Sequence, residues 1–215
     1  SAMKNRVIAA FLSFLLLSFL VPYSVGAEEG KKRNGSEELL EAIEGHKVQK
    51  VRDLLKNNSS LVNLRFEDEE GYGAMTPIFY AIKVKDAEIC KILIDAGADV
   101  NFVSVSLGSP LHYAVFKAEQ DIVLLLLDSK ADINKPAGFG PPQEGKRWFE
   151  NATPLHLAIT GGEKQLVRLL INRGADPNMK VAHRKCTNGW CSLLELAALS
   201  RRDELIPLLK EYDLK

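Results

Sequence analysis

The sequence predicts an all-α solenoid of about five helix–turn–helix units that carry β-hairpin fingers, and two repeated phrases support that prediction. The first phrase recurs as "MTPIFYA", "GSPLHYA" and "ATPLHLA", beginning at Met75, Gly108 and Ala152. The second recurs as "AGADVN", "SKADIN" and "RGADPN", ending at Asn101, Asn134 and Asn178. Two phrases repeated in step are typical of small structural units that bury their apolar faces only by stacking.

The spacing of the first phrase gives the period of the units. Thr76, Ser109, Thr153 and Ser192 hold the same place in the phrase. The first interval between them is about 33 residues, and the next two are longer by about 11 and about 6 residues, which indicates one period with two insertions. Thr or Ser at this place caps a first helix. A following Pro suits the first turn, because its missing N–H would be unpaired there.

The second phrase predicts how each unit ends. The segment before it carries apolar residues at helical spacing, as in Ile89, Ile92 and Leu93, and therefore indicates a second helix. Gly97 and Gly174 then stand where a helix ends in a left-handed residue. The Asp and Asn that follow favour a turn, which leads the chain outward into a finger.

A period of this length that carries T-P-L-H-x-A and G-A-D-x-N resembles the ankyrin repeat, over about residues 36–212. This resemblance implies a concave face, made by the fingers and the first helices, that binds other proteins. It also implies that His112 and His156 bridge backbone groups of neighbouring units and are structural. Phe79 and Glu195 stand in the histidine position of two other units.

The chain is expected to contain three fuller repeats between two caps. The first unit lacks T-P-L-H and the last lacks G-A-D-x-N, as suits units with one solvent-facing side. We expect the repeat domain to cover residues 36–215, with units at about 36–68, 69–101, 102–134, 145–178 and 185–215 and inserted fingers at 135–151 and 179–191.

The N-terminal segment predicts export. Residues 1–2 precede a methionine and are interpreted as a cloning remnant. Residues 3–27 combine basic residues, an apolar run and a small-residue exit, as in a secretory signal peptide cleaved after Ala27. The alternative is a membrane anchor, but the apolar run is shorter than the roughly 20 residues that a spanning helix needs. Residues 28–35 are expected to be a loose tether.

Charge and motifs argue against two functional classes. The chain has 28 basic and 28 acidic residues, which gives no general attraction for a phosphate backbone, so we expect no nucleic-acid partner. No carboxylate or nucleophile recurs at a fixed offset from His112 or His156, as a catalytic triad would need. We therefore expect no enzyme activity and no cofactor.

The cysteines fall into two groups. Cys186 and Cys191 frame "CTNGWC" in the shorter insertion, and in an exported protein this spacing favours a structural disulfide. Free thiols, or a metal or redox site that includes His183, are the alternatives. Cys90 lies at a core position of a second helix and is expected to be a buried, inert thiol.

Aromatic and apolar residues on the fingers and first helices are the candidate contact residues. Both tryptophans lie in the inserted fingers, and large side chains on loops of a rigid framework are typical binding anchors. The alternative is that the inserted loops only cover the core. The predicted contact residues are Tyr80, Lys83, Phe102, Val105, Leu107, Tyr113, Phe116, Lys117, Phe139, Trp148, Phe149 and Trp190.

The sequence thus predicts a monomeric protein-binding module of the bacterial periplasm, free of the membrane after signal cleavage. It resembles the small exported ankyrin proteins of bacteria, some of which inhibit the producing cell's own cell-wall-cleaving enzymes. That resemblance implies a periplasmic hydrolase as the partner. The alternatives are a thiol- or metal-dependent redox protein that uses Cys186, Cys191 and His183, and a secreted effector that binds host proteins.

Overall fold

The computed structural model describes residues 35–67, 73–140, 149–183, 186 and 189–212. The chain divides into a segment Ser1–Arg33 and a body Asn34–Lys215, and only the body is described below. The predicted signal peptide and all of the predicted tether except Gly35 lie outside the described residues. Among the helices of the described residues, none has the length and apolarity needed to cross a membrane.

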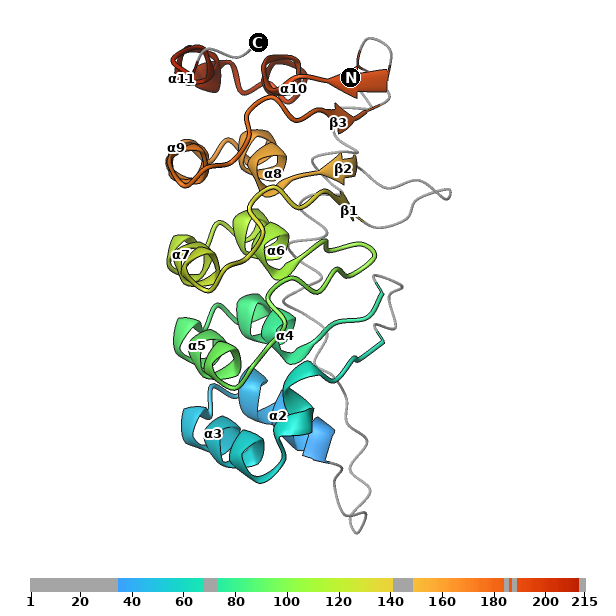
Figure 1. Ribbon diagram of the computed structural model, residues 1–215, viewed down its shortest axis with the longest axis vertical. Coiled ribbons are helices and arrows are strands. Elements are labelled where there is room, and N and C mark those ends of the chain that lie inside the picture. Colours follow the sequence, from blue (N-terminus) through green and yellow to red (C-terminus); the bar gives the residue numbers. More distant parts are fainter. Residues whose placement is uncertain (1–34, 68–72, 141–148, 184–185, 187–188, 213–215) are drawn as a thin grey trace. The chain divides into compact units, whose positions relative to one another are not determined.

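The described residues form five helix pairs that stack in one column (Figure 1). The first helices are α2 (Gly35–Glu44), α4 (Pro77–Lys83), α6 (Pro110–Phe116), α8 (Pro154–Gly161) and α10 (Leu193–Leu199). The second helices are α3 (Val48–Asn57), α5 (Ala87–Asp95), α7 (Gln120–Asp128), α9 (Lys164–Asn172) and α11 (Ile206–Lys210). Each first helix packs against its own second helix and against the first helices of the neighbouring pairs. A 3₁₀ helix, Ser59–Asn63, follows α3, and another, Asp203–Leu205, leads into α11.

The turns inside the helix pairs share one backbone feature. A residue just after the first helix of each described pair has a positive φ, at His46, Lys85, Ala118, Gly162 and Arg201. Gly162 is the only glycine of this set, and a Cβ there would lie 2.9 Å from Nε of Arg202. Gly97 and Gly174 also have positive φ, of 92° and 95°, which confirms the predicted ends of α5 and α9.

The second phrase of the repeat joins each unit to the next through an asparagine side chain. Oδ1 of Asn101 accepts a hydrogen bond from the backbone N–H of Asp132 at 2.8 Å, and Nδ2 of Asn101 donates to the carbonyl of Lys130 at 3.3 Å. Asn134 makes the equivalent pair with Asp176 and Gly174. The turn of one unit is thus held by the unit before it, which explains why the asparagine recurs.

The two inserted fingers pair with each other. Four short strands, β1 (Ala137–Phe139), β2 (Phe149–Ala152), β3 (Val181–Ala182) and β4 (Trp190–Cys191), form one antiparallel sheet in that order. The β2–β3 contact, at Glu150 and Ala182, joins the finger before α8 to the finger before α10. The predicted β-hairpin fingers therefore include a sheet that spans two units.

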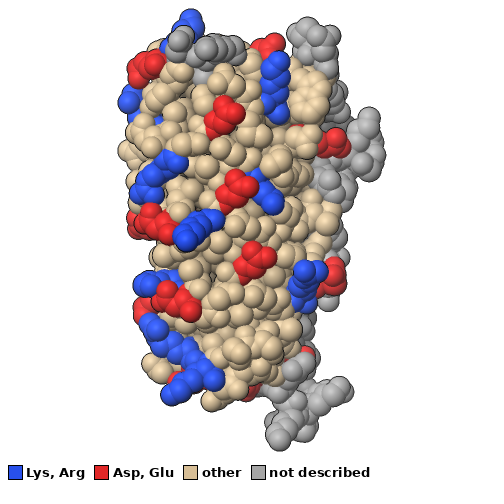
Figure 2. All heavy atoms as spheres, in the orientation of Figure 1, with Lys and Arg blue, Asp and Glu red and all other residues tan. Residues whose placement is uncertain are grey.

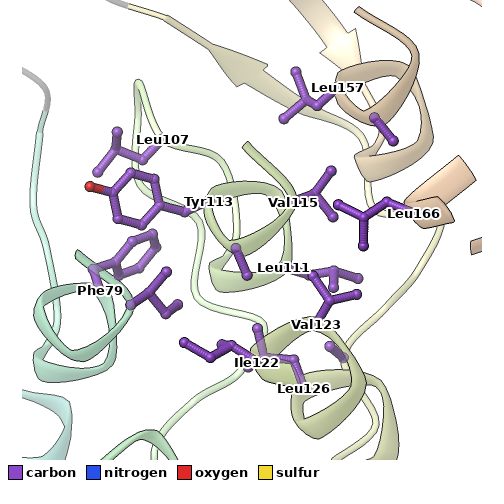
Figure 3. Packing of buried hydrophobic residues seen from close by; sticks show 14 of the residues in the cluster. Phe79, Leu107, Leu111, Tyr113, Val115, Ile122, Val123, Leu126, Leu157 and Leu166 are labelled. Carbon is purple, nitrogen blue, oxygen red and sulfur yellow. The ribbon is translucent and has the colours of Figure 1, made fainter. Parts of the chain in front are cut away.

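The hydrophobic core runs through the whole stack. Leu111 and Val115 of α6 lie near Leu126 of α7, in the same helix pair, and near Leu157 and Leu166 of the next pair (Figure 3). All of these side chains are at most 5 % exposed. Because each unit contributes only part of this core, one unit alone would leave apolar surface in water.

The first full unit departs from the capping pattern of its neighbours. In the next two units a histidine accepts a hydrogen bond from the N–H of the capping Ser or Thr, but Phe79 occupies that position after Thr76. The hydroxyl of Thr76 is buried and has no hydrogen-bond partner. Phe79 contacts the rings of Phe102 and Tyr113 instead. Aromatic packing therefore replaces a hydrogen-bond network here.

We expect Thr76→Val to leave the free energy of unfolding unchanged or to raise it by about 1 kcal/mol, since the substitution removes a buried hydroxyl that lacks a partner. Thr153→Val is the matched control, because the Thr153 hydroxyl bonds Nδ1 of His156 at 2.7 Å. In the control, the free energy of unfolding should fall by about 1–2 kcal/mol. Urea denaturation measures both variants, and equal losses would contradict the prediction.

Candidate protein-interaction surface

The fingers and the first helices meet through pairs of aromatic rings. Phe66 in the first finger lies edge-to-face against Tyr80 of α4, with ring centroids 5.8 Å apart. Phe116, the last residue of α6, lies against Phe139 of β1 with centroids 5.1 Å apart. Phe66, Tyr80 and Phe116 are only partly buried. Each pair therefore leaves aromatic surface at the junction of a finger and a first helix.

Three lysines lie close together at the ends of α4 and α6. Lys83 is exposed, and Nζ of Lys117 lies 5.5 Å from the ring centroid of Tyr113. Partial burial lowers the pKa of Lys117, and repulsion from Lys85 and Lys83 lowers it further, while Glu119 acts in the opposite direction. Glu119 also forms an ion pair with Lys85. The local charge is therefore positive, although the chain as a whole is neutral.

We call Phe66, Tyr80, Lys83, Phe116 and Lys117 the finger–helix surface. Tyr80 and Lys83 lie three residues apart on α4 and therefore share a face. On the face of the molecule that Figure 2 shows, acidic and basic side chains are intermingled.

The structure sorts the predicted contact residues by their accessibility. Lys83, Val105 and Trp190 are exposed, with 55 % of Val105 and 45 % of Trp190 accessible. Five more are half-buried at the surface: Tyr80, Phe102, Phe116, Lys117 and Phe149. Trp148 lies outside the described residues.

Three predicted contact residues belong to the core, and their assignment is corrected here. Leu107 and Tyr113 are 5 % exposed and Phe139 is 1 % exposed. Tyr113 packs on Phe79 with Leu107 beside it (Figure 3), and Phe139 lies under Phe116. For Leu107 and Phe139, which lie on fingers, this burial agrees with the alternative interpretation that the loops cover the core.

Sequence reasoning missed three residues near the finger–helix surface. Phe66 forms an antiparallel β-bridge with Met75 in the first finger, as Ser104 does with Gly108 in the second. The position of Phe66 in a finger was the sequence signal that could have identified it. The guanidinium of Arg65 lies 4.9 Å from the ring centroid of Phe102. Lys85 completes the lysine cluster, but its approach to Lys117 depends on how two units stack.

His112 and His156 are held in equivalent buried networks. Nδ1 of His112 accepts from the N–H of Ser109 at 3.2 Å, so Nε2 carries the proton and donates to the carbonyl of Ala152 in the next unit, at 2.9 Å. His156 makes the same contacts with Thr153 and with the carbonyl of Met179. Burial lowers the pKa of each histidine to about 4. Both rings are at most 1 % exposed, so neither offers a base to a bound substrate.

The cysteines divide as expected. Cys186 and Cys191 lie at disulfide distance, with their Cα atoms 5.2 Å apart. Cys90 is fully buried on α5, and burial followed by the charge of Asp86 raises the pKa of its thiol to about 12. A thiol of that pKa in the core is not a nucleophile at neutral pH.

Comparison with protein-family models identifies the repeating units. Residues 39–137 match the model described as ankyrin repeats in three copies, and residues 150–181 match the model described as a single ankyrin repeat. Together these matches cover more than half of the 215 residues. A search of curated proteins gives no significant match to the chain.

Proposed function

The chain belongs to the ankyrin-repeat family, and we propose that it is a non-enzymatic, monomeric protein-binding module of the bacterial periplasm. Members of this family are in general scaffolds for protein partners. We count its five helix pairs as three fuller repeats between two capping repeats. The signal-peptide pattern at residues 3–27 supports the proposed location.

The finger–helix surface is the observation that carries the proposal. It combines partly exposed aromatic rings with lysines on a stack of helices. Aromatic rings bury a large area on binding with little loss of rotamer entropy, and the lysines add charge. The three neighbouring lysines repel one another, and an anionic partner would relieve that repulsion. The surface therefore suits a partner that presents acidic side chains beside an apolar anchor.

The proposed partner is a periplasmic enzyme that cleaves the cell wall, and the proposed mode of inhibition is steric. This assignment rests on the resemblance to exported bacterial ankyrin proteins that protect the producing cell. A rigid surface seated over an active site excludes a polymeric substrate without any chemical step. A secreted effector would use the same surface on a host protein, and the source of the captured partner separates the two functions.

The direct test is affinity capture from periplasm with residues 28–215, followed by identification of the bound protein. The captured enzyme should cleave cell-wall polymer more slowly when residues 28–215 are added in excess. Capture of no periplasmic protein, or undiminished cleavage by the captured enzyme, would count against the proposed inhibition.

We expect Phe116→Ala to weaken binding of the captured partner about tenfold to a hundredfold, as for a central aromatic anchor. Lys83→Ala combined with Lys117→Ala should slow association and make binding less sensitive to salt. Lys91→Ala combined with Lys164→Ala is the matched control, since these two exposed lysines lie on second helices. Surface plasmon resonance at two salt concentrations measures all three, and equal effects of the two lysine pairs would refute this surface.

A further inference from the structure

We infer that the finger before α10 holds a zinc site when its cysteines are reduced, with His183, Cys186 and Cys191 as ligands. The potential ligand atoms of these three residues all lie within 4.8 Å of one another. Ligand atoms around a tetrahedral zinc ion lie about 3.5–3.8 Å apart, so small side-chain adjustments complete the arrangement. The inference is independent of the proposed protein partner.

The strand register explains why two of the ligands meet. Val181 pairs with Cys191 and Ala182 with Trp190, and the N–H of His183 donates to the carbonyl of Gly189 at 3.0 Å. His183 therefore follows β3 in the same register, two residues beyond the partner of Cys191. Side chains two residues apart lie on one face of a strand pair, and a diagonal neighbour is within reach of a long side chain. His183 and Cys191 thus share one face of this hairpin.

Cys186 is brought to the same face by the loop that joins the strands. Its N–H donates to the carbonyl of His183 at 3.1 Å, and its carbonyl accepts from the N–H of Gly189 at 3.0 Å. Gly189 has a φ of 79°, which allows the tight return of the chain. These backbone contacts hold the loop independently of the bond between the sulfurs, so the ligands remain near one another after reduction.

The chemistry of the three residues suits zinc. Two thiolates and one imidazole supply three ligands and leave a fourth position for water. The ring of His183 lies beside that of Phe149, with centroids 5.9 Å apart, which restricts the orientation of the imidazole.

The disulfide and the metal are alternative states of one site. A dithiol reductant supplies two electrons and two protons to the bond between Cys186 and Cys191 and becomes a disulfide itself. A zinc ion then displaces the two thiol protons as it binds the sulfurs. A disulfide oxidant reverses the change: it accepts the two electrons from the sulfurs, takes up two protons from water to become a dithiol, and the bond between Cys186 and Cys191 forms again as the ion is released. Trp190 immediately precedes Cys191 and is 45 % exposed, so the state of the site changes the surroundings of a predicted contact residue.

The test is titration of residues 28–215 with zinc alone, after reduction by a phosphine and its removal without oxygen. We expect one zinc ion per reduced chain and at least a hundredfold weaker binding to the oxidised chain. In a Trp148→Phe background, the fluorescence of Trp190 should change in parallel with zinc binding. Cobalt in place of zinc should give the absorption bands of tetrahedral thiolate ligation.

Two variants make the assignment falsifiable. Cys186→Ser with Cys191→Ser should abolish this binding, and His183→Ala should weaken it at least tenfold while both thiols remain. Circular dichroism checks that each variant is folded. Zinc binding to the reduced chain no tighter than to the double serine variant would overturn the proposal. Equal affinity of the reduced chain and His183→Ala would remove His183 from the site and overturn it as well.

Discussion

Replacing His112 with alanine is expected to lower the free energy of unfolding by about 4 kcal/mol. The imidazole accepts a hydrogen bond from the N–H of Ser109, contacts its hydroxyl at 2.8 Å and donates to the carbonyl of Ala152. Its removal leaves three buried polar groups without that partner, each at a cost of about 1–3 kcal/mol before relaxation. The contact with Ala152 also joins two units, so the loss weakens their stacking.

Urea denaturation at neutral pH measures this loss, with His46→Asn as the control. The side chain of His46 is 57 % exposed and pairs with Asp86, and asparagine tolerates the positive φ of 52° at that position. The control should change the unfolding free energy by less than about 1 kcal/mol. A loss below about 1 kcal/mol for His112→Ala would show that the bridging network is not stabilising.

Acidification from pH 7 to pH 5 is expected to destabilise the fold by about 2 kcal/mol for each of His112 and His156. In the folded chain burial lowers the pKa of both rings to about 4, whereas the ordinary value is 6.5. The unfolded chain therefore binds protons that the folded chain does not, and this contribution to stability is fully present above pH 6.5. It is lost progressively as the pH falls toward 4.

Unfolding midpoints between pH 7 and pH 4 measure this dependence. His156→Gln should take up one proton fewer than the parent chain on unfolding in this range. Its unfolding midpoint should therefore change less steeply with pH. Asp86 contributes to the dependence of folding stability on pH only at lower pH. Burial raises its pKa, but hydrogen bonds from Ile89 and His46 outweigh burial, so its pKa is lowered below 3.8 and its contribution disappears as the pH falls through that region. An unchanged midpoint from pH 7 to pH 5 would contradict the assigned roles of both histidines.

The helix pairs were predictable because the responsible signals are local and repeated. Thr153 followed by Pro154 begins α8, and Gly174 ends the unit where a left-handed residue was expected. The bridging role of His156 followed from its resemblance to a known repeat, and its hydrogen bonds agree with it. The starts and ends of the helices depend on a few consecutive residues. The histidine bridge recurs because each of these units packs against a similar unit.

The candidate surface was only partly predictable, because exposure depends on contacts between fingers. Phe116 and Phe139 were both predicted as contact residues, but Phe116 lies at the surface and Phe139 is buried beneath it. Nothing in the spacing of Phe139 shows that β1 folds over α6. Similarly, Lys85 and Lys117 approach each other only because α4 and α6 stack.

The sequence by itself determined the repeating helix pairs and the residues that begin and end their helices, since each follows from local geometry within one period. Tertiary structure alone decided which aromatic rings face solvent and that the two inserted fingers join in one sheet. It also placed His183 on the same strand face as Cys191. The physical reason is that a period along the chain does not encode how an inserted loop pairs with itself or folds onto its neighbour.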